Sequence, residues 1–176
     1  WNKHKKMEQE VLKNADEVIT VSHHYAEGLK ALFKREIHVI TNGFDDAEFE
    51  KVADIAPEGF IIRHLGVVDE HRNPWPLLQA IEKLAEQNIH IHIEFVGNVN
   101  ETLKAEIKEH TMLSKCVVFK PYVPHREVLA LYRKSAVLLS LPMNAENAKG
   151  NIPGKIFEYL AAKRPILAIG DTTGDA

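Results

Sequence analysis

The segment from Gly150 to Ile169 combines residue types that can bind an anion with the start of a helix. Pro153 suits the first position of a helix, because its missing N–H would have no acceptor there. The backbone N–H groups of Gly154, Lys155 and Ile156 would then point at whatever lies before the helix. Phosphate groups bind well at such helix starts. The segment therefore predicts a phosphate-binding site.

Two charged residues of this predicted helix, Lys155 and Glu158, offer chemically distinct roles. A cation in the first turn opposes the helix dipole unless an anion is bound nearby, so Lys155 fits a site that neutralises phosphate. Glu158 follows one turn later, where its carboxylate can accept hydrogen bonds from the hydroxyls of a ribose. The alternative is a surface pair between the two side chains, which would contribute only about 0.2–0.5 kcal/mol.

The loop Leu65–Pro74 holds a second cation, Arg72, just before a predicted helix. Gly66, at the start of the loop, allows backbone to come close to a ligand. A guanidinium presents a fixed fork of donors that matches phosphate oxygens, so Arg72 is a candidate to bind a diphosphate. The alternative is a surface arginine paired with Asp69 or Glu70.

Two other loops contribute weaker signals. Gly97 follows one predicted strand, and Tyr122 and Val123 follow the next. Their backbone N–H and C=O groups could read the edge of a flat base. Each is a weak signal on its own, and they are candidates for ligand binding only together with the charged residues.

Several other kinds of site find no support in the sequence. No Gly-x-Gly-x-x-Gly follows a strand, and neither a P-loop nor a serine elbow occurs. His90 and His92 alternate along a predicted strand, but no third ligand lies close by in the sequence, so we expect no metal site.

The candidate residues need a scaffold of alternating strands and helices. Residues 3–14 and 24–34 have helical spacing, and 18–21 and 37–40 are short apolar strands. We expect residues 1–43 to be the end of an N-terminal domain. Residues 44–59 show little periodicity and are predicted to be an interdomain linker.

From residue 60 the alternation becomes regular. Strands at 60–66, 89–97, 116–119, 136–141 and 165–169 are separated by helices at 75–86, 100–110, 125–134 and 153–162. This order predicts an α/β fold with a doubly wound parallel sheet, Rossmann-like, in which ligands bind beyond the carboxyl ends of the strands.

The composition is that of a globular protein of 176 residues, with 45% hydrophobic and 27% charged residues. A net charge of -3 and scattered basic residues argue against a nucleic-acid partner. Cys116 is the single cysteine, which fits a reducing compartment, and we expect a cytoplasmic location.

Neither end of the chain resembles a natural terminus. It begins at Trp1 and stops at Ala176, shortly after a predicted strand, so we expect a fragment of a longer protein. No apolar run approaches the roughly 20 residues that span a bilayer. Any membrane contact of the full-length protein would be peripheral, at the inner face of the membrane.

Taken together, these segments resemble the retaining GT-B glycosyltransferases of family four, also called glycosyl transferases group 1. Residues 15–22 look like the last strand of that family's N-terminal domain, and 39–44 resemble its "V-I-x-N-G-V/F-D" crossing into the C-terminal domain. Residues 65–81 align without gaps to "G-R-L-x-x-x-K-G-x-x-x-L-L-x-A", and 117–140 are similar to "V-x-F-x-G-x-V-P-x-x-x-L…L-Y-x-x-A-D-V-x-L-x-P".

The resemblance implies roles for particular residues. Arg72 takes the place of the family's diphosphate-binding lysine, whereas Val67 replaces its arginine. The backbone around Tyr122 and Val123 would recognise the base. Glu158 takes the place of the second glutamate of the Glu-x7-Glu motif, which binds the ribose hydroxyls.

The first glutamate of that motif would fall at Gly150, so this half is missing. Residues 153–161 look instead like the variant "P-x-K-x-x-E-Y-L-A" of polysaccharide-assembly members. In that variant Lys155 helps to hold the diphosphate.

The resemblance also implies an activity. Residues 60–176 would be a nucleotide-sugar-binding domain, incomplete at its C-terminus, that binds a UDP- or GDP-sugar for hexosyl transfer in cell-surface polysaccharide or glycan synthesis. The cations Arg72 and Lys155 would act in catalysis by stabilising the departing diphosphate, so no metal cofactor is expected. The glycan or lipid-linked acceptor belongs mainly to the N-terminal domain, so this chain alone should bind donor without turnover.

Two alternatives remain open from the sequence. One is a GT-B sugar-nucleotide epimerase, although its dedicated carboxylates and histidines cannot be placed here. The other is a nonenzymatic nucleotide-binding or interaction module that kept the fold, since fold alone does not fix function.

Overall fold

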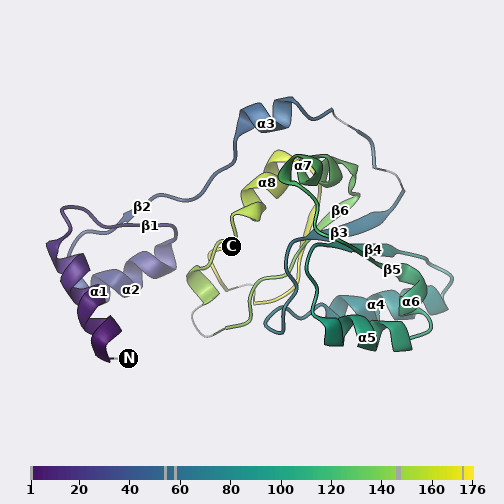
Figure 1. The fold of residues 1–176 in the computed structure, drawn as a ribbon, viewed down its shortest axis with the longest axis horizontal. Helices are drawn as coiled ribbons and strands as arrows, with labels where there is room; N and C mark the ends of the chain where they lie inside the picture. The colour runs from purple at the N-terminus through teal and green to yellow at the C-terminus, as the bar shows by residue number, and fades with distance from the viewer. Residues whose placement is uncertain (1, 54, 58, 146–147, 172) are drawn as a thin grey trace. The chain divides into compact units, whose positions relative to one another are not determined.

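The computed structural model describes residues 2–53, 55–57, 59–145, 148–171 and 173–176 (Figure 1). The described residues form two compact units. The first consists of those within Trp1–Asn42, Glu146–Pro153 and Thr172–Ala176, and the second of those within Gly43–Ala145 and Gly154–Asp171. Each unit has a buried apolar core of its own.

The first unit is a small α/β arrangement. Strands β1 and β2 pair in parallel, and Ser22 caps α2 by accepting a hydrogen bond from the backbone N–H of Tyr25. Its core contains the buried side chains of Val18, Ala26 and Ile37. The two helices and two strands predicted from the sequence are confirmed. Its elements are α1 (Asn2–Asn14), β1 (Ile19–Thr20), α2 (His23–Phe33), β2 (His38–Val39) and η1 (Ala148–Gly150).

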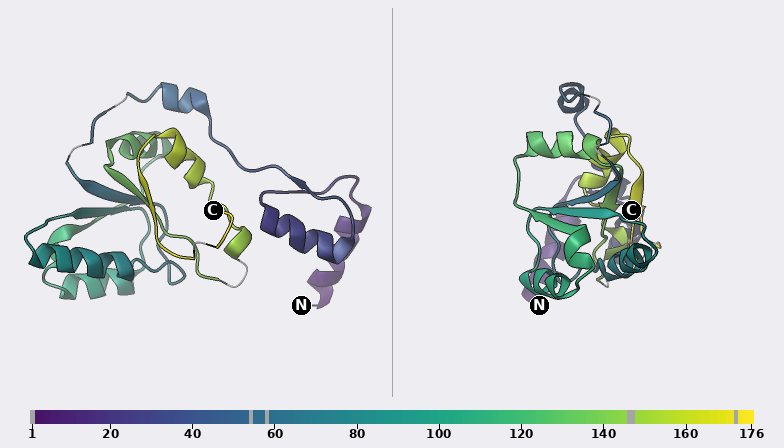
Figure 2. Two further views of the ribbon diagram at one scale, coloured as in Figure 1. Left: turned by 180° about the vertical axis from the view of Figure 1, so that it is seen from behind. Right: turned by 90° about the vertical axis from the view of Figure 1, so that its right-hand side faces the viewer.

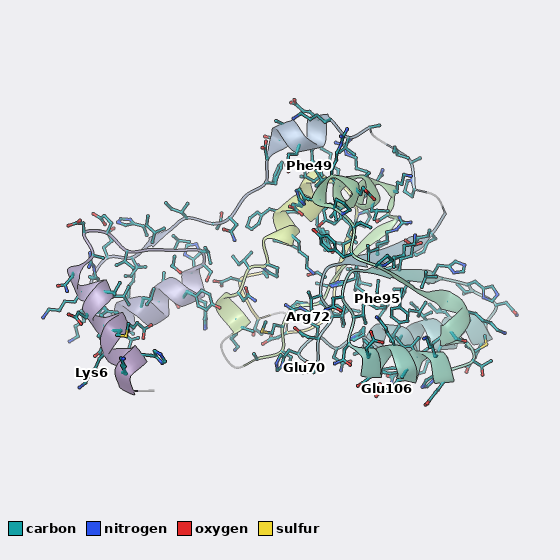
Figure 3. The ribbon with its side chains drawn as sticks, viewed as in Figure 1. Lys6, Phe49, Glu70, Arg72, Phe95 and Glu106 are labelled. Carbon is teal, nitrogen blue, oxygen red and sulfur yellow. The ribbon has the colours of Figure 1, made fainter. Side chains whose placement is uncertain are left out.

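The segment predicted to be a linker contains a short helix, α3 (Asp46–Glu50). Asp45 caps it by accepting a hydrogen bond of 2.9 Å from the N–H of Ala47. Phe49 is buried in a core of the second unit, and its carbonyl accepts a hydrogen bond from Arg133 (Figure 3). A single aromatic anchor in a five-residue helix leaves no periodicity for sequence analysis to detect. Residues 54 and 58 of the predicted linker lie outside the described residues.

The second unit is built on a five-stranded sheet in which every described pairing is parallel. The strand order is β5-β4-β3-β6-β7, so the chain moves outward from β3 in one direction and then returns to build the other side. This confirms the predicted doubly wound sheet. The strands are β3 (Ile61–Leu65), β4 (His92–Val96), β5 (Val117–Lys120), β6 (Val137–Ser140) and β7 (Ile166–Ala168).

Helices cover both faces of this sheet (Figures 1 and 2). The helices on one face are called the first layer here, and those on the other face the second layer. Successive residues of a strand point to opposite faces, so Phe95 packs against the first layer and Val96 against the second. Figure 3 labels Phe95 within the sheet. The first layer contains α4 (Trp75–Glu86), α5 (Glu101–Glu109) and α6 (Leu113–Cys116), and the second α7 (His125–Lys134) and α8 (Lys155–Ala161).

The start of β4 and one short helix of this unit also differ from the prediction. Strand β4 begins at His92 rather than at residue 89, because Asn88 adopts a left-handed conformation and the N–H of Ile89 bonds back to the carbonyl of Leu84. These residues therefore complete the end of α4. Helix α6 was not predicted, since four residues are too few to show a helical period.

A buried ionic cluster crosses the sheet between β3 and β5. Arg63 lies opposite Glu94 in the strand register, and its Nε is 2.5 Å from the carboxylate. Lys120 donates to the other oxygen of Glu94 at 2.9 Å. Burial opposes the charge of Glu94, but these two bonds outweigh it and hold its pKa below the usual value. The removal of Glu94 would take away the counterion of the buried Arg63 guanidinium.

The loops after β3 and β4 stay paired beyond the strands. Val68 forms an isolated parallel bridge with Val99, and its N–H donates to the carbonyl of Asn98. Gly97 has a φ of +125°, and a Cβ there would lie 2.6 Å from the carbonyl oxygen of Gly66. The two glycines thus allow these loops to approach each other closely.

We predict that Gly97→Ala destabilises the second unit. The left-handed backbone alone costs about 1–3 kcal/mol for a non-glycine residue, and the overlap with Gly66 adds to it. The matched control is Gly154→Ala, because Gly154 has a φ of -53° and no neighbour within 4 Å of an added Cβ. Urea unfolding followed by circular dichroism measures both; equal midpoints for the two variants would contradict the prediction.

Candidate functional site

Lys155 lies beside the carboxyl end of β3, next to the strand-order reversal between β3 and β6. It is the first residue of α8, and its Nζ is 3.4 Å from the carbonyl oxygen of Leu65 and 3.4 Å from Nε2 of His64. A Cβ on Gly66 would lie 3.3 Å from the same ammonium. Ligands of doubly wound sheets bind at such a reversal, so the structure places Lys155 and Gly66 at the expected position.

Arg72 lies in the loop that follows β3 (Figure 3). Its Nη1 is 2.5 Å from the carboxylate of Asp69, so the alternative of an ion pair with Asp69 is realised. Burial raises the pKa of Asp69, but the hydrogen bond and charge of Arg72 outweigh it and leave this pKa below its usual value. The side chain of Arg72 remains 20% exposed and can still meet a ligand.

The charges of Arg72 and Lys155 influence each other. Burial lowers the pKa of Lys155, and the nearby charge of Arg72 lowers it further, to about 8. Within the described residues, no carboxylate forms an ion pair with Lys155. Two cations near one another, one of them without a counterion, form a site that an anion would stabilise.

The side chain of Glu158 contacts a different set of residues from the side chain of Lys155. The hydroxyl of Tyr132 donates to its Oε2 at 2.9 Å, and Nε2 of His125 lies 3.8 Å from its Oε1. The predicted alternative of a pair between Lys155 and Glu158 is therefore not what these side chains form. The Glu158 side chain is 24% exposed, so its carboxylate is held in place yet reachable.

Tyr132 and Tyr159 pack against each other, and Tyr132 contacts Glu158. Their rings meet edge to face, with centroids 5.0 Å apart. The hydroxyl of Tyr159 donates to the carbonyl of Leu139 and lies 3.5 Å from the N–H of Leu65. Burial and the charge of Glu158 raise the pKa of Tyr132 above its usual value, so its hydroxyl stays protonated and donates a hydrogen bond to Glu158.

The start of α8 differs from the prediction. Pro153 was expected at the first helical position, but the helix begins at Lys155 and Pro153 lies two residues earlier. Gly154 already has helical angles, and its carbonyl accepts a hydrogen bond from the N–H of Phe157. The first turn thus forms from Gly154 onward, and Lys155 remains in it as predicted.

The remaining predicted residues follow the neighbouring strands. The N–H of Gly97 donates to the carbonyl of Lys120, so this amide is used within the fold. Tyr122 is 79% exposed after β5, and Val123 packs against the core under α7 and α8. The structure brings Gly66, Arg72 and Lys155 together, while Tyr122 and Val123 follow β5, the edge strand of the sheet.

Position 150 has no space for a side chain. A Cβ on Gly150 would overlap the ring of Tyr25, which belongs to the same unit. This gives a steric reason why no glutamate stands there.

The first unit also contains a cavity of about 420 Å³, mostly apolar in its lining. None of the residues predicted to bind a ligand lines it. The lining residues are Thr20, His24, Tyr25, Gly28 and Leu29.

Nowhere in the described residues do three or more His, Cys, Asp or Glu side chains gather as a metal site would require. None of the helices in the described part of the chain has the length and apolar composition of a membrane span.

Sequence analysis missed His64 and Tyr132 as parts of the site. His64 is fully buried in β3, where the neighbouring residues are mostly apolar. A polar pair, Arg63-His64, inside a buried strand was the available signal, because such residues need partners. The role of Tyr132 depends on the packing of α7 against α8, which no local pattern shows.

The second unit thus belongs to the Rossmann-like class of α/β folds, with its charged residues at the carboxyl end of the central strand. Residues 45–174 match the family described as Glycosyl transferases group 1. Because this match covers well over half of the chain, the chain belongs to that family. The predicted resemblance is confirmed at this level.

Solved structures show the same fold. Sucrose-phosphate synthase from Thermosynechococcus elongatus has a TM-score of 0.74 and 19% identity, over 96% of this chain and 44% of that one. The pneumococcal O-GlcNAc transferase GtfA in complex with UDP and GlcNAc gives 0.68 and 13%, over 94% and 33%. The C-terminal domain of the glycosyl transferase group 1 family protein LpcC from Francisella tularensis gives 0.54 and 16%, over 72% and 70%.

These identities are low, so the likeness shows the fold alone. The chain spans 44% and 33% of the first two proteins' chains. No curated protein matches the sequence.

The shifted pKa of Lys155 predicts a pH-dependent stability. The unfolded lysine titrates near 10.5 and the folded one near 8, so between these values the unfolded chain holds more protons. Stability from this group therefore rises with pH across that window.

The measurement is urea unfolding of the wild type and of Lys155→Met from pH 7.5 to 10. The free energy of unfolding of the wild type, relative to that of Lys155→Met, should increase as the pH rises. Both proteins share all other titrating groups, so a difference that stays constant with pH would contradict the assigned environment of Lys155.

Proposed function

We propose that this chain is the donor-binding part of a retaining glycosyltransferase of family four, which uses a UDP- or GDP-sugar for hexosyl transfer in cell-surface polysaccharide or glycan synthesis. The observation that carries the proposal is the pair of cations, Arg72 and Lys155, at the carboxyl end of β3. Membership of the glycosyl transferases group 1 family supports it. The UDP and GlcNAc in the GtfA structure give a precedent for the ligand class.

The diphosphate is the part of the donor that the two cations would bind. Arg72 offers a planar fork for phosphate oxygens, and Lys155 offers a compact charge that lacks an ion-pair partner among the described carboxylates. As the glycosidic bond breaks, negative charge grows on the leaving nucleoside diphosphate. Cations already in place stabilise that charge without reorganisation, and this is the catalytic role we assign to Arg72 and Lys155.

The ribose hydroxyls would bind Glu158. Tyr132 already occupies one carboxylate oxygen at 2.9 Å, which fixes the direction of the other. The backbone of Gly66, Gly97, Tyr122 and Val123 would complete the donor site around the base, and Pro153 and Gly154 would contribute backbone at the approach to α8. The transfer would need no divalent metal, because the two cations take the place of a metal at the diphosphate.

The acceptor would be a glycan or lipid-linked glycan. We assign it mainly to an N-terminal domain, of which residues 1–43 are the end, and residues 60–176 form the donor domain. The enzyme would act in the cytoplasm, at the inner face of the membrane, with only peripheral membrane contact. The chain alone would bind donor without turnover.

We predict that this chain binds one nucleoside diphosphate selectively, and that Glu158→Gln and Arg72→Met each weaken the binding about tenfold or more, equivalent to about 1.4 kcal/mol. Each variant removes a charge-assisted contact while nearly preserving side-chain size. Calorimetric titration with UDP, GDP, ADP and CMP measures the affinities.

The controls are Glu127→Gln and Arg126→Met, two exposed residues of α7 that match the charges removed. They should leave the affinity unchanged. Affinities of the site variants equal to the wild type would contradict the assigned residues. No binding by a wild-type sample with an intact circular dichroism spectrum would favour a nonenzymatic module.

A further inference from the structure

His64 is a fully buried histidine in direct contact with the proposed diphosphate site. Its Nδ1 lies 2.9 Å from the carbonyl oxygen of Leu139 on β6. Its Nε2 lies 3.4 Å from Nζ of Lys155 and 3.4 Å from the carbonyl oxygen of Val67. The ring therefore connects the centre of the sheet to a cation of the site.

These contacts decide which nitrogen carries the proton. A carbonyl oxygen only accepts, so the short contact with Leu139 requires a proton on Nδ1. Nε2 then has a free lone pair, which accepts from the Lys155 ammonium. The opposite tautomer would let Nε2–H donate to the carbonyl oxygen of Val67, 3.4 Å away, but it would place a lone pair against the closer carbonyl of Leu139 and an N–H against the ammonium. The shorter contact, at 2.9 Å, and the ammonium therefore both favour the proton on Nδ1.

Burial and the charges around the ring keep it neutral. Lys155 on α8 and Arg72 on the loop after β3 are the cations that act on it, and Arg72 is paired with Asp69. Burial first, and then these two cations, lower the pKa of His64 to about 3. The lone pair on Nε2 is therefore present at every pH at which the protein would work.

The neutral ring restricts the ammonium of Lys155. A lysine has three N–H donors, and here Nε2 of His64 and the carbonyl of Leu65 accept two of them. One donor remains for a ligand. Gly66 leaves the space next to the ammonium open, since a Cβ there would come within 3.3 Å of it.

We propose that His64 is a positioning residue for the donor diphosphate: its Nε2 accepts a hydrogen bond from Lys155 and holds the ammonium where it meets a phosphate oxygen. This inference rests on the proposed function. His64 acts through Lys155 and itself makes no contact with the donor.

Two substitutions test the roles of the two ring nitrogens separately. His64→Gln places a side-chain oxygen near the position of Nε2 and keeps an acceptor for Lys155. His64→Asn places its amide near the position of Nδ1 and keeps the bond to Leu139, but it loses the acceptor. Both side chains are polar and smaller than histidine, so each variant serves as the control for folding of the other.

The test is a calorimetric titration of both variants with the nucleoside diphosphate that the wild type binds, from pH 6.5 to 9.5. We expect His64→Asn to bind about tenfold more weakly, as befits the loss of one hydrogen bond to a charged group, and His64→Gln to bind like the wild type. The alkaline loss of binding should also move to lower pH in His64→Asn, because its ammonium lacks an acceptor. Equal affinities and equal pH profiles in both variants would overturn the proposal.

A second readout does not depend on the nucleotide. The rate at which acetic anhydride modifies Lys155, followed by peptide mass spectrometry across pH, reports the fraction of free amine. The pH at the midpoint of this modification should be lower in His64→Asn than in the wild type, and it should be unchanged in His64→Gln. If no nucleotide binds but this midpoint still moves, the proposed function fails and the contact stands; an unmoved midpoint overturns the contact itself.

Discussion

The half-buried position of Lys155 is the constraint on which the candidate site depends. An ammonium that loses water must find other partners, and here it finds a carbonyl oxygen and a neutral imidazole, with no carboxylate ion pair among the described residues. The doubly wound sheet makes this possible, because its central strand is followed directly by a glycine, Gly66, beside the first residue of α8. The cation is therefore held in a form that an anion would stabilise.

The other parts of the second unit serve to keep that position fixed. Tyr159 of α8 donates a hydrogen bond to the carbonyl of Leu139 on β6, and Tyr132 of α7 donates one to Glu158. Gly97 lets the loop after β4 support the loop that holds Arg72. Two helices and two glycine-containing loops thus support the cation pair at the carboxyl end of β3 and the carboxylate of Glu158 on α8.

Much of the fold of the second unit was predictable from the sequence. The periodicity gave all five strands of the sheet and the charged residues of α8, because buried strands and amphipathic helices leave strong local patterns. The helix around Phe49 and the roles of His64 and Tyr132 were not predictable, since each depends on residues far away in the chain. The missing glutamate at position 150 was visible, but only the packing of Tyr25 shows why glycine stands there.

The most direct test of the central claim is a crystal structure of the chain soaked with UDP or GDP, whichever binds. The account predicts phosphate oxygens within hydrogen-bond distance of Lys155 Nζ and the Arg72 guanidinium, the ribose at Glu158, and His64 still in contact with Lys155. A nucleotide bound elsewhere in the second unit, with its phosphates away from both cations, would contradict it.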